Sequence, residues 1–256
     1  MFIILYMSKK YIAQFDILKK RNIQDRNNEI VTIRNSHVFQ KITTLLPKGA
    51  QILDCGAGEG KLSRKLYKFG YKVQACDLRP KDFRFDKITC KYSDLNNKFP
   101  YANGVFDAVI CLEVIEHLEN PWHLLRECKR VLKRNGIVVL SSPNISNVTS
   151  RIIFFIKGKI DLFLDMDTEH INPITFWEIK RVLSDVGFSL VEVSGDVDVV
   201  KNVGIVTHIT NSAMKLFYVI FFTVLLSFYK IYTNKKDVPE VLLNSLCYVI
   251  VAKKRN

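Results

Sequence analysis

The stretch that decides the fold reads Ile52-Leu53-Asp54-Cys55-Gly56-Ala57-Gly58-Glu59-Gly60. Its apolar start predicts a short buried strand, and glycines at alternate positions then predict a tight turn before a helix near Lys61. Glycine lets the backbone turn sharply and lets a ligand approach where a Cβ atom would collide. The spacing D-x-G-x-G-x-G departs from the nicotinamide fingerprint, which requires its third glycine at Lys61. A P-loop is also excluded, because no G-K-[ST] closes the turn.

Acidic residues stand at the ends of three successive predicted strands. Asp54 ends the first, where a carboxylate repels a pyrophosphate and attracts a cation. Asp77, followed by Leu78, ends the second, from which a carboxylate can accept both hydroxyls of a ribose. Asp94, followed by Leu95, ends the third and can accept from an adenine amino group. Together with the glycine turn, these acids predict a pocket for a positively charged nucleoside without phosphate, which is S-adenosylmethionine (SAM).

Outward from this turn, short apolar runs alternate with amphipathic segments. The runs cover residues 51–55, 72–77, 88–92, 106–112 and 136–142. This alternation is typical of an open, mostly parallel α/β sheet with crossover helices. A strand over 188–193 and a buried last strand over 246–252 complete the expected set.

Capping residues locate the expected helices. One helix runs from about Ser36 to a stop at Pro47. A second begins at Asn120-Pro121 and is expected to end at Asn135-Gly136. A third begins with the capping box Thr175-x-x-Glu178 and ends at Gly187.

The whole chain has 256 residues, of which 48% are hydrophobic and 25% are charged. This composition excludes a disordered tail protein, a collagen-like fibre and a polytopic membrane protein. A formal charge of +13 suits an acidic substrate, an anionic membrane face or nucleic acid, but also a lysine-rich solvated surface. The six cysteines form no C-x-x-C pair, so we expect a reduced, cytoplasmic protein without a disulfide framework or a zinc site.

Two apolar stretches exceed what a minimal α/β domain needs. Residues 152–164 are interpreted as part of a lid over the acceptor. Leu216–Tyr229 contains fourteen residues without a charge, which as a helix would cover roughly 21 Å of a bilayer core of about 30 Å. A buried or dimer-contact helix, an interfacial membrane helix and a true span are the alternatives.

Residues 51–144 resemble a class I SAM-dependent methyltransferase. The run FDAVICLEVIEHL at 106–118 matches the family's fourth-strand motif, residues 127–136 match its following helix, and residues 141–144 match the end of its fifth strand. The resemblance implies an α/β, Rossmann-like, mostly parallel seven-stranded sheet with helices on both faces and hydrophobic inserts before the sixth and seventh strands. The polar, weakly patterned start of the chain predicts an N-terminal arm over 1–34, and the rest a single domain over 35–256 in which the two apolar stretches form a lid insert at 145–172 and a helical insert at 200–235.

The same resemblance assigns the cofactor site. The implied SAM-binding residues are Asp54, Gly56, Gly58, Gly60, Asp77, Leu78, Asp94, Leu95 and Glu113.

Within the superfamily, the chain is similar to O-methyltransferases of quinone biosynthesis and to bacterial enzymes that methylate glycans or lipid-linked sugars. In the quinone branch, the run Glu113-x-x-Glu116-His117 is associated with a divalent metal, which implies a Mg²⁺ site on these three residues. The alternative is that Glu113 lines the cofactor pocket and His117 caps or positions a helix. No Asp-Pro-Pro-Tyr or Asn-Pro-Pro-Tyr motif follows the fourth strand, which disfavours methylation of exocyclic amines on nucleic-acid bases.

A hydroxyl acceptor must lose a proton when it takes the methyl group, so a general base is expected. His117 and His170 are the candidate catalytic residues, since both are expected beyond the carboxyl ends of parallel strands, although either could be structural. The predicted function is O-methylation of a small or lipid-linked acceptor, of the sugar or quinol type, in the cytoplasm or at the inner membrane face through Leu216–Tyr229. The alternatives are an RNA methyltransferase, disfavoured by the lack of a recognisable RNA-binding module, and a non-catalytic cofactor-binding scaffold.

Overall fold

The computed structural model describes residues 34–147, 150–151, 154–155, 158–160, 169–196 and 245–255, together with Thr32 and Val224. Apart from Thr32 and Arg34, the predicted N-terminal arm over 1–34 therefore lies outside the described residues, as do most of the lid insert and, apart from Val224, the helical insert with Leu216–Tyr229. No helix among the described residues is both long and apolar enough to cross a membrane.

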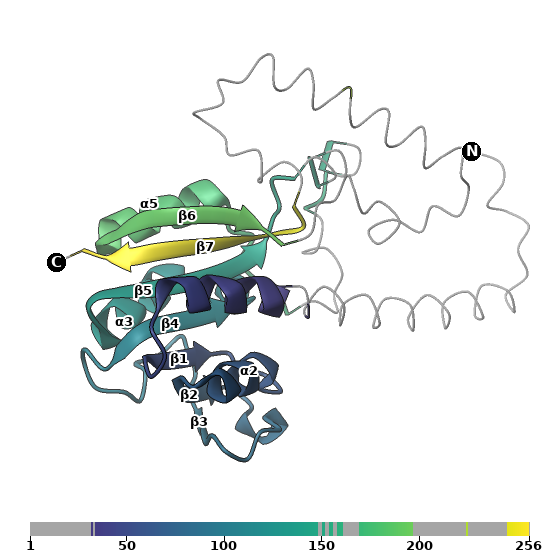
Figure 1. The fold of residues 1–256 in the computed structure, drawn as a ribbon. Helices are drawn as coiled ribbons and strands as arrows, with labels where there is room; N and C mark the ends of the chain where they lie inside the picture. Colours follow the sequence, from purple (N-terminus) through teal and green to yellow (C-terminus); the bar gives the residue numbers. More distant parts are fainter. Residues whose placement is uncertain are drawn as a thin grey trace, which may run out of the picture.

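One seven-stranded sheet in the order β3-β2-β1-β4-β5-β7-β6 organises the described part of the chain (Figure 1). β1 to β5 pair in parallel, and β7 is antiparallel to both β5 and β6. The fold prediction of a mostly parallel seven-stranded α/β sheet is confirmed. The strands are β1 (Gln51–Cys55), β2 (Lys72–Asp77), β3 (Cys90–Tyr92), β4 (Phe106–Leu112), β5 (Leu132–Pro143), β6 (Phe188–Gly195) and β7 (Cys247–Lys254).

Helices cover both faces of the sheet, as predicted. On one face a helix over 34–45, drawn in dark purple in Figure 1, packs with α2 (Lys61–Phe69) on strand residues such as Ile52. On the other face α3 (Pro121–Val131) and α5 (Phe176–Val186) pack on strand residues such as Leu53. Successive strand residues thus enter opposite cores, which explains why the central strands are apolar along their whole length.

The local capping signals are confirmed. The Asn120 side chain accepts a hydrogen bond from the His123 amide (2.9 Å), and the Thr175 hydroxyl accepts one from the Glu178 amide (3.2 Å). Gly187 ends α5 with a φ of 104°, a left-handed conformation that suits glycine. β7 lies between β5 and β6, so the last strand is buried as expected.

The predicted end of α3 at Asn135-Gly136 is wrong. The helix ends at Val131, and Leu132 already has the extended conformation and pairs with Phe106 of β4. Leu132 is fully buried in the structure. An apolar residue is expected at this position both in the last turn of a helix and at the start of a buried strand, so its apolar character could not separate the two.

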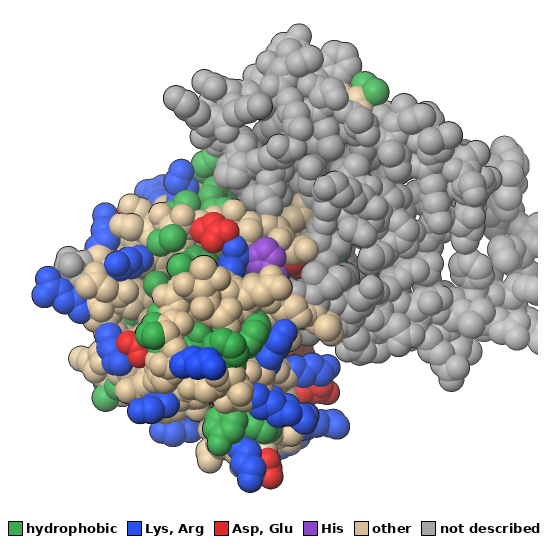
Figure 2. Space-filling view, viewed as in Figure 1, with side chains coloured by type: hydrophobic (Ala, Val, Ile, Leu, Met, Phe, Trp, Pro, Cys, Tyr) green, Lys and Arg blue, Asp and Glu red, His purple; other side chains and the backbone are tan. Residues whose placement is uncertain are grey.

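Positive charge is dispersed over the described surface. Figure 2 shows Lys and Arg side chains spread over the visible described face, with uncharged and apolar groups between them. Several basic groups of the α3 region are held by the fold: Lys129 Nζ donates to the Val186 carbonyl (2.7 Å) and Arg130 forms an ion pair with Glu127 (2.6 Å). On the face seen in Figure 2, the basic groups form no continuous track of the kind that follows a nucleic-acid backbone.

Candidate active site

The glycine turn joins β1 to α2 and has left-handed backbone angles at all three glycines, with φ of 70° at Gly56, 51° at Gly58 and 79° at Gly60. A Cβ atom at Gly56 would lie 2.4 Å from Val114 Cγ2, and one at Gly60 would lie 2.6 Å from the Phe83 ring. A Cβ atom at Gly58 would meet no protein atom within 4 Å. Packing therefore requires glycine at the first and third positions, whereas Gly58 leaves open space.

Two adjoining hollows lie at the carboxyl ends of the parallel strands. The first, of about 290 Å³, is lined by the glycine turn with Arg34, Asp54 and Glu113. The second, of about 410 Å³, is lined by the ends of β2 and β3 and by the segment after β4. Gly56 and Glu113 line both hollows, which together form one elongated site. The predicted cofactor residues that line the second hollow are Gly56, Asp77, Leu78, Asp94, Leu95 and Glu113.

Hydrogen bonds from nearby amide groups hold the half-buried carboxylates of Asp77 and Asp94 in place. Asp77 accepts hydrogen bonds from the amides of Gly58 (2.9 Å) and Arg79 (2.8 Å). Asp94 accepts from the Asn96 amide (2.9 Å) and from the Asn97 side chain. A carboxylate has about four lone-pair sites, so each of these groups keeps acceptor capacity for a ligand in the hollow.

Asp54 is more deeply placed than the other two acids. It is only 4% exposed and accepts a 2.6 Å hydrogen bond from the Ser63 hydroxyl. Burial raises the pKa of Asp54 to about 7, although the Ser63 hydrogen bond acts in the opposite direction. A cation in the first hollow would favour the ionised form of this group.

Glu113 has an unusual backbone and a fully engaged side chain. Its φ is 53°, and its two carboxylate oxygens face the Ser141 hydroxyl (2.7 Å) and the Arg34 guanidinium (3.3 Å). Arg34 also pairs with Asp196 at the end of β6 (2.9 Å) and is itself only 5% exposed. The ion pairs raise the pKa of the Arg34 guanidinium against the opposing effect of its burial.

Arg34 is a residue of the site that sequence reasoning missed. It lines the first hollow, yet it lies at the boundary between the expected arm and the expected domain. Its partner Asp196 lies 162 positions away in the sequence, so no local spacing signals their ion pair.

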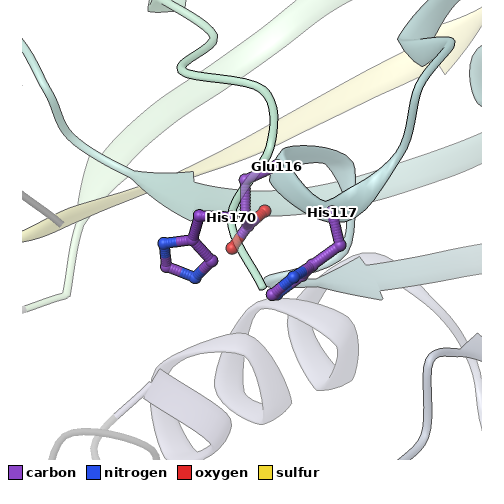
Figure 3. A group of neighbouring side chains, drawn as sticks. All are labelled: Glu116, His117 and His170. Atoms are coloured by element: carbon purple, nitrogen blue, oxygen red, sulfur yellow. The ribbon is translucent and has the colours of Figure 1, made fainter. Parts of the chain in front are cut away.

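The two predicted catalytic histidines are neighbours. His117 ends the short 3₁₀ helix η3 (Ile115–His117) after β4, and His170 arrives from the segment before α5. Their ring centroids are 4.7 Å apart with an interplanar angle of 65°. The segment carrying His170 is fixed to η3 because the amides of Ile171 and Asn172 both donate to the Glu116 carbonyl. Figure 3 shows the Glu116 side chain extending toward the space beside both rings.

The residues implied for a metal fit only in part. Glu116 is completely buried, and neither carboxylate oxygen has a hydrogen-bond partner among the described residues. Its possible ligand atoms lie within 4.8 Å of those of His117 and His170. Glu113, by contrast, is already engaged by Ser141 and Arg34. The structure therefore groups Glu116 and His117 with His170, which the sequence-based set did not include.

Comparison with known proteins identifies the chain. Residues 53–140 match the family model described as "Methyltransferase domain". A ubiquinone biosynthesis O-methyltransferase from Xanthomonas axonopodis pv. citri is 30% identical over a gapped alignment of 161 positions, which covers 59% of this chain and 67% of that relative. The chain belongs to the class I SAM-dependent methyltransferases.

A further sequence relative and two solved structures are also methyltransferases. A ubiquinone biosynthesis O-methyltransferase from Psychrobacter arcticus is 27% identical over 169 residues, 61% of this chain and 65% of that protein. A SAM-dependent methyltransferase from Archaeoglobus fulgidus matches the fold with a TM-score of 0.57 at 19% identity, covering 86% of this chain and 94% of that structure. A putative methyltransferase from Bacillus halodurans has a TM-score of 0.58 at 17% identity, covering 87% and 99%. The predicted family, fold and methyl donor are confirmed.

Proposed function

We propose that this methyltransferase transfers the methyl group of SAM to a hydroxyl oxygen of a small or lipid-linked acceptor, of the quinol or sugar type. The observation that carries the proposal is the pair of imidazoles, His117 and His170, of which His117 lines the second hollow directly. The ubiquinone biosynthesis O-methyltransferases among its relatives support an oxygen acceptor.

We assign the nucleoside of SAM to the second hollow. Asp77 would accept the ribose hydroxyls, and Asp94 would accept the adenine amino group beside the apolar side chain of Leu78, which is 58% exposed there. The charged methionine part would occupy the first hollow, where ionised Asp54 offers negative charge and Glu113 lies paired with Arg34.

The protein's part in the transfer is mainly alignment and removal of a proton. The reaction is an in-line displacement, so acceptor oxygen, methyl carbon and sulfur must lie on one line, and fixing them can supply several kcal/mol. His117 Nδ1 donates to the Glu169 carbonyl (2.9 Å), which leaves Nε2 with the lone pair needed to accept a hydroxyl proton. Such a base contributes roughly 100-fold or more to the rate.

An apolar surface in the described part of the lid insert supports a lipid-linked or aromatic acceptor. A hollow of about 250 Å³ is lined by residues of the lid insert that include Ile145, Phe154 and Ile160, together with Thr175. Phe155 is 89% exposed in the same insert. Exposed apolar groups of this kind commonly mark a ligand-binding or membrane-facing surface.

The test uses SAM labelled in its methyl group and mass spectrometry of the products. Purified enzyme is incubated in parallel with an extracted lipid fraction, with polar small molecules and with total RNA. The proposal predicts label on oxygen in one of the first two fractions. It also predicts that His117→Ala lowers turnover by roughly 100-fold while SAM affinity, measured by calorimetry, changes little. Label on nitrogen, or in RNA alone, would overturn it.

A further inference from the structure

An unsatisfied buried carboxylate lies beside the two histidines. Glu116 has zero exposure, and both of its carboxylate oxygens lack a hydrogen-bond partner among the described residues. A buried polar group without a partner is strongly unfavourable, so such a group calls for a proton, an ion or a ligand that satisfies it. The backbone of Glu116 is held in place, because its carbonyl accepts hydrogen bonds from the amides of Ile171 and Asn172.

The neighbouring imidazoles are arranged as metal ligands usually are. The Glu169 carbonyl accepts the Nδ1 hydrogen of His117, and a backbone carbonyl in this role fixes the tautomer in which Nε2 is free to bind a metal. His170 approaches from the other side at a centroid distance of 4.7 Å. Figure 3 shows the Glu116 carboxylate and the two rings facing a common region.

The distances permit one ion once the three side chains rotate toward it. The possible ligand atoms of Glu116, His117 and His170 all lie within 4.8 Å of one another. Three ligands that share one ion at about 2.1 Å lie roughly 3.0–3.6 Å from one another, so groups 4.8 Å apart need to close by about 1.2–1.8 Å, which rotation of the three side chains can supply. The two histidines are half-buried, which leaves a route from the solvent and the second hollow.

We infer that Glu116, His117 and His170 form a site for a divalent first-row transition metal, and that Glu113 is not one of its ligands. Two imidazole nitrogens and one carboxylate favour Zn²⁺, Co²⁺ or Mn²⁺ over Mg²⁺, which prefers oxygen ligands. The inference adds His170 to the residues that the resemblance implied and removes Glu113, whose oxygens face Ser141 and Arg34. It uses no cysteine, in agreement with the spacing of the cysteines in the sequence.

Only the role of the metal ion in the reaction rests on the proposed function; the metal site itself does not. A dication at this position would lower the pKa of an acceptor hydroxyl and orient it toward the methyl group. His117 Nε2 would then bind the ion instead of taking the proton, and the acidified hydroxyl would release its proton to solvent as the methyl group is transferred. Metal binding itself can be measured without any turnover, so the site and the reaction can be tested separately.

The experiment is a titration of the chelator-treated full chain with Co²⁺, followed by calorimetry and by the visible absorption of the ion, and repeated with Mg²⁺. The wild-type protein is expected to bind one Co²⁺ per chain, at least roughly 10-fold more tightly than Mg²⁺. Glu116→Gln and His170→Ala should each weaken Co²⁺ binding by roughly 10-fold or more. The matched control Glu113→Gln should bind Co²⁺ as the wild-type protein does.

Several results would overturn the inference. These are the absence of stoichiometric Co²⁺ binding by the wild-type protein, the same loss in Glu113→Gln as in Glu116→Gln, or unchanged binding in His170→Ala. Circular dichroism of each variant reports whether it folds. Should a variant fail to fold, broadening of the imidazole NMR signals of His117 and His170 by Mn²⁺ in the wild-type protein decides the question. Label transfer to oxygen by a metal-free enzyme would refute the inferred metal site's role and leave the proposed function intact.

Discussion

The buried carboxylate of Asp54 gives a prediction whose size follows from the structure. An aspartate has an ordinary pKa of 3.8, and burial raises that of Asp54 in the folded protein to about 7. This difference corresponds to about 4 kcal/mol of folding free energy. Below about pH 3 the carboxyl group is protonated in both the folded and the unfolded state, so the stability that comes from burying it in neutral form is fully present. As the pH rises from about 4 to 7, the unfolded chain loses the proton while the folded protein keeps it, so stability falls.

The substitution Asp54→Asn removes this titration and keeps an oxygen that can accept from Ser63, which donates to Asp54 at 2.6 Å. The wild-type protein should therefore lose stability between pH 4 and pH 7.5, whereas the variant should not. The difference in free energy of unfolding, variant minus wild type, should increase by up to about 4 kcal/mol over this range. Urea unfolding of both proteins at several pH values measures the difference. Parallel curves over the whole range would refute the reasoning.

The same group couples protonation to the cofactor. A sulfonium or ammonium group in the first hollow favours ionised Asp54, so SAM binding should release a proton near neutral pH. SAM affinity of the wild-type protein should accordingly rise between about pH 6 and pH 8, whereas that of Asp54→Asn should be weaker and nearly flat. Calorimetry in buffers with different ionisation enthalpies detects the released proton.

Other substitutions separate folding from binding. Gly58→Val and the control Gly49→Val both place a side chain in open space at a positive φ (51° and 83°), so each should lose about 1–2 kcal/mol of stability, but only Gly58→Val should abolish SAM binding. Normal SAM binding by Gly58→Val would contradict the placement. Asp77→Ala should weaken SAM binding by roughly 100-fold with the fold retained, because charge-assisted hydrogen bonds to the ribose are lost; calorimetry and circular dichroism check both parts. Arg34→Met leaves two carboxylates without their cation and should destabilise the protein by about 3–5 kcal/mol in urea unfolding, and wild-type stability in this variant would disprove a structural role for the buried ion pairs.

The sequence predicted those features that depend on neighbours along the chain. β1, β2 and β4 begin and end at the predicted residues, because runs of apolar residues bounded by a turn are local signals. The caps at Asn120 and Thr175 rest on hydrogen bonds across three positions, which the spacing also records. The glycine turn and the acids after β1, β2 and β3 are signals of the same kind.

Contacts between distant segments left no such signal. The end of α3 depends on Leu132 pairing with Phe106, and the ion pair of Arg34 with Asp196 depends on the closure of the whole sheet. The meeting of Glu116 with His170 likewise follows from the docking of a later segment on η3. In the sequence, a glutamate and a histidine are each compatible with a solvated loop. Only the three-dimensional arrangement brings Glu116 and His170 together.

A crystal structure of the protein with S-adenosylhomocysteine would test the central claim most directly. The account predicts one ligand per chain across the two hollows, with its ribose hydroxyls on Asp77, its adenine beside Leu78 and its amino acid part at the glycine turn. A dinucleotide in these hollows after parallel soaking, with the homocysteine ligand bound elsewhere or not at all, would contradict it.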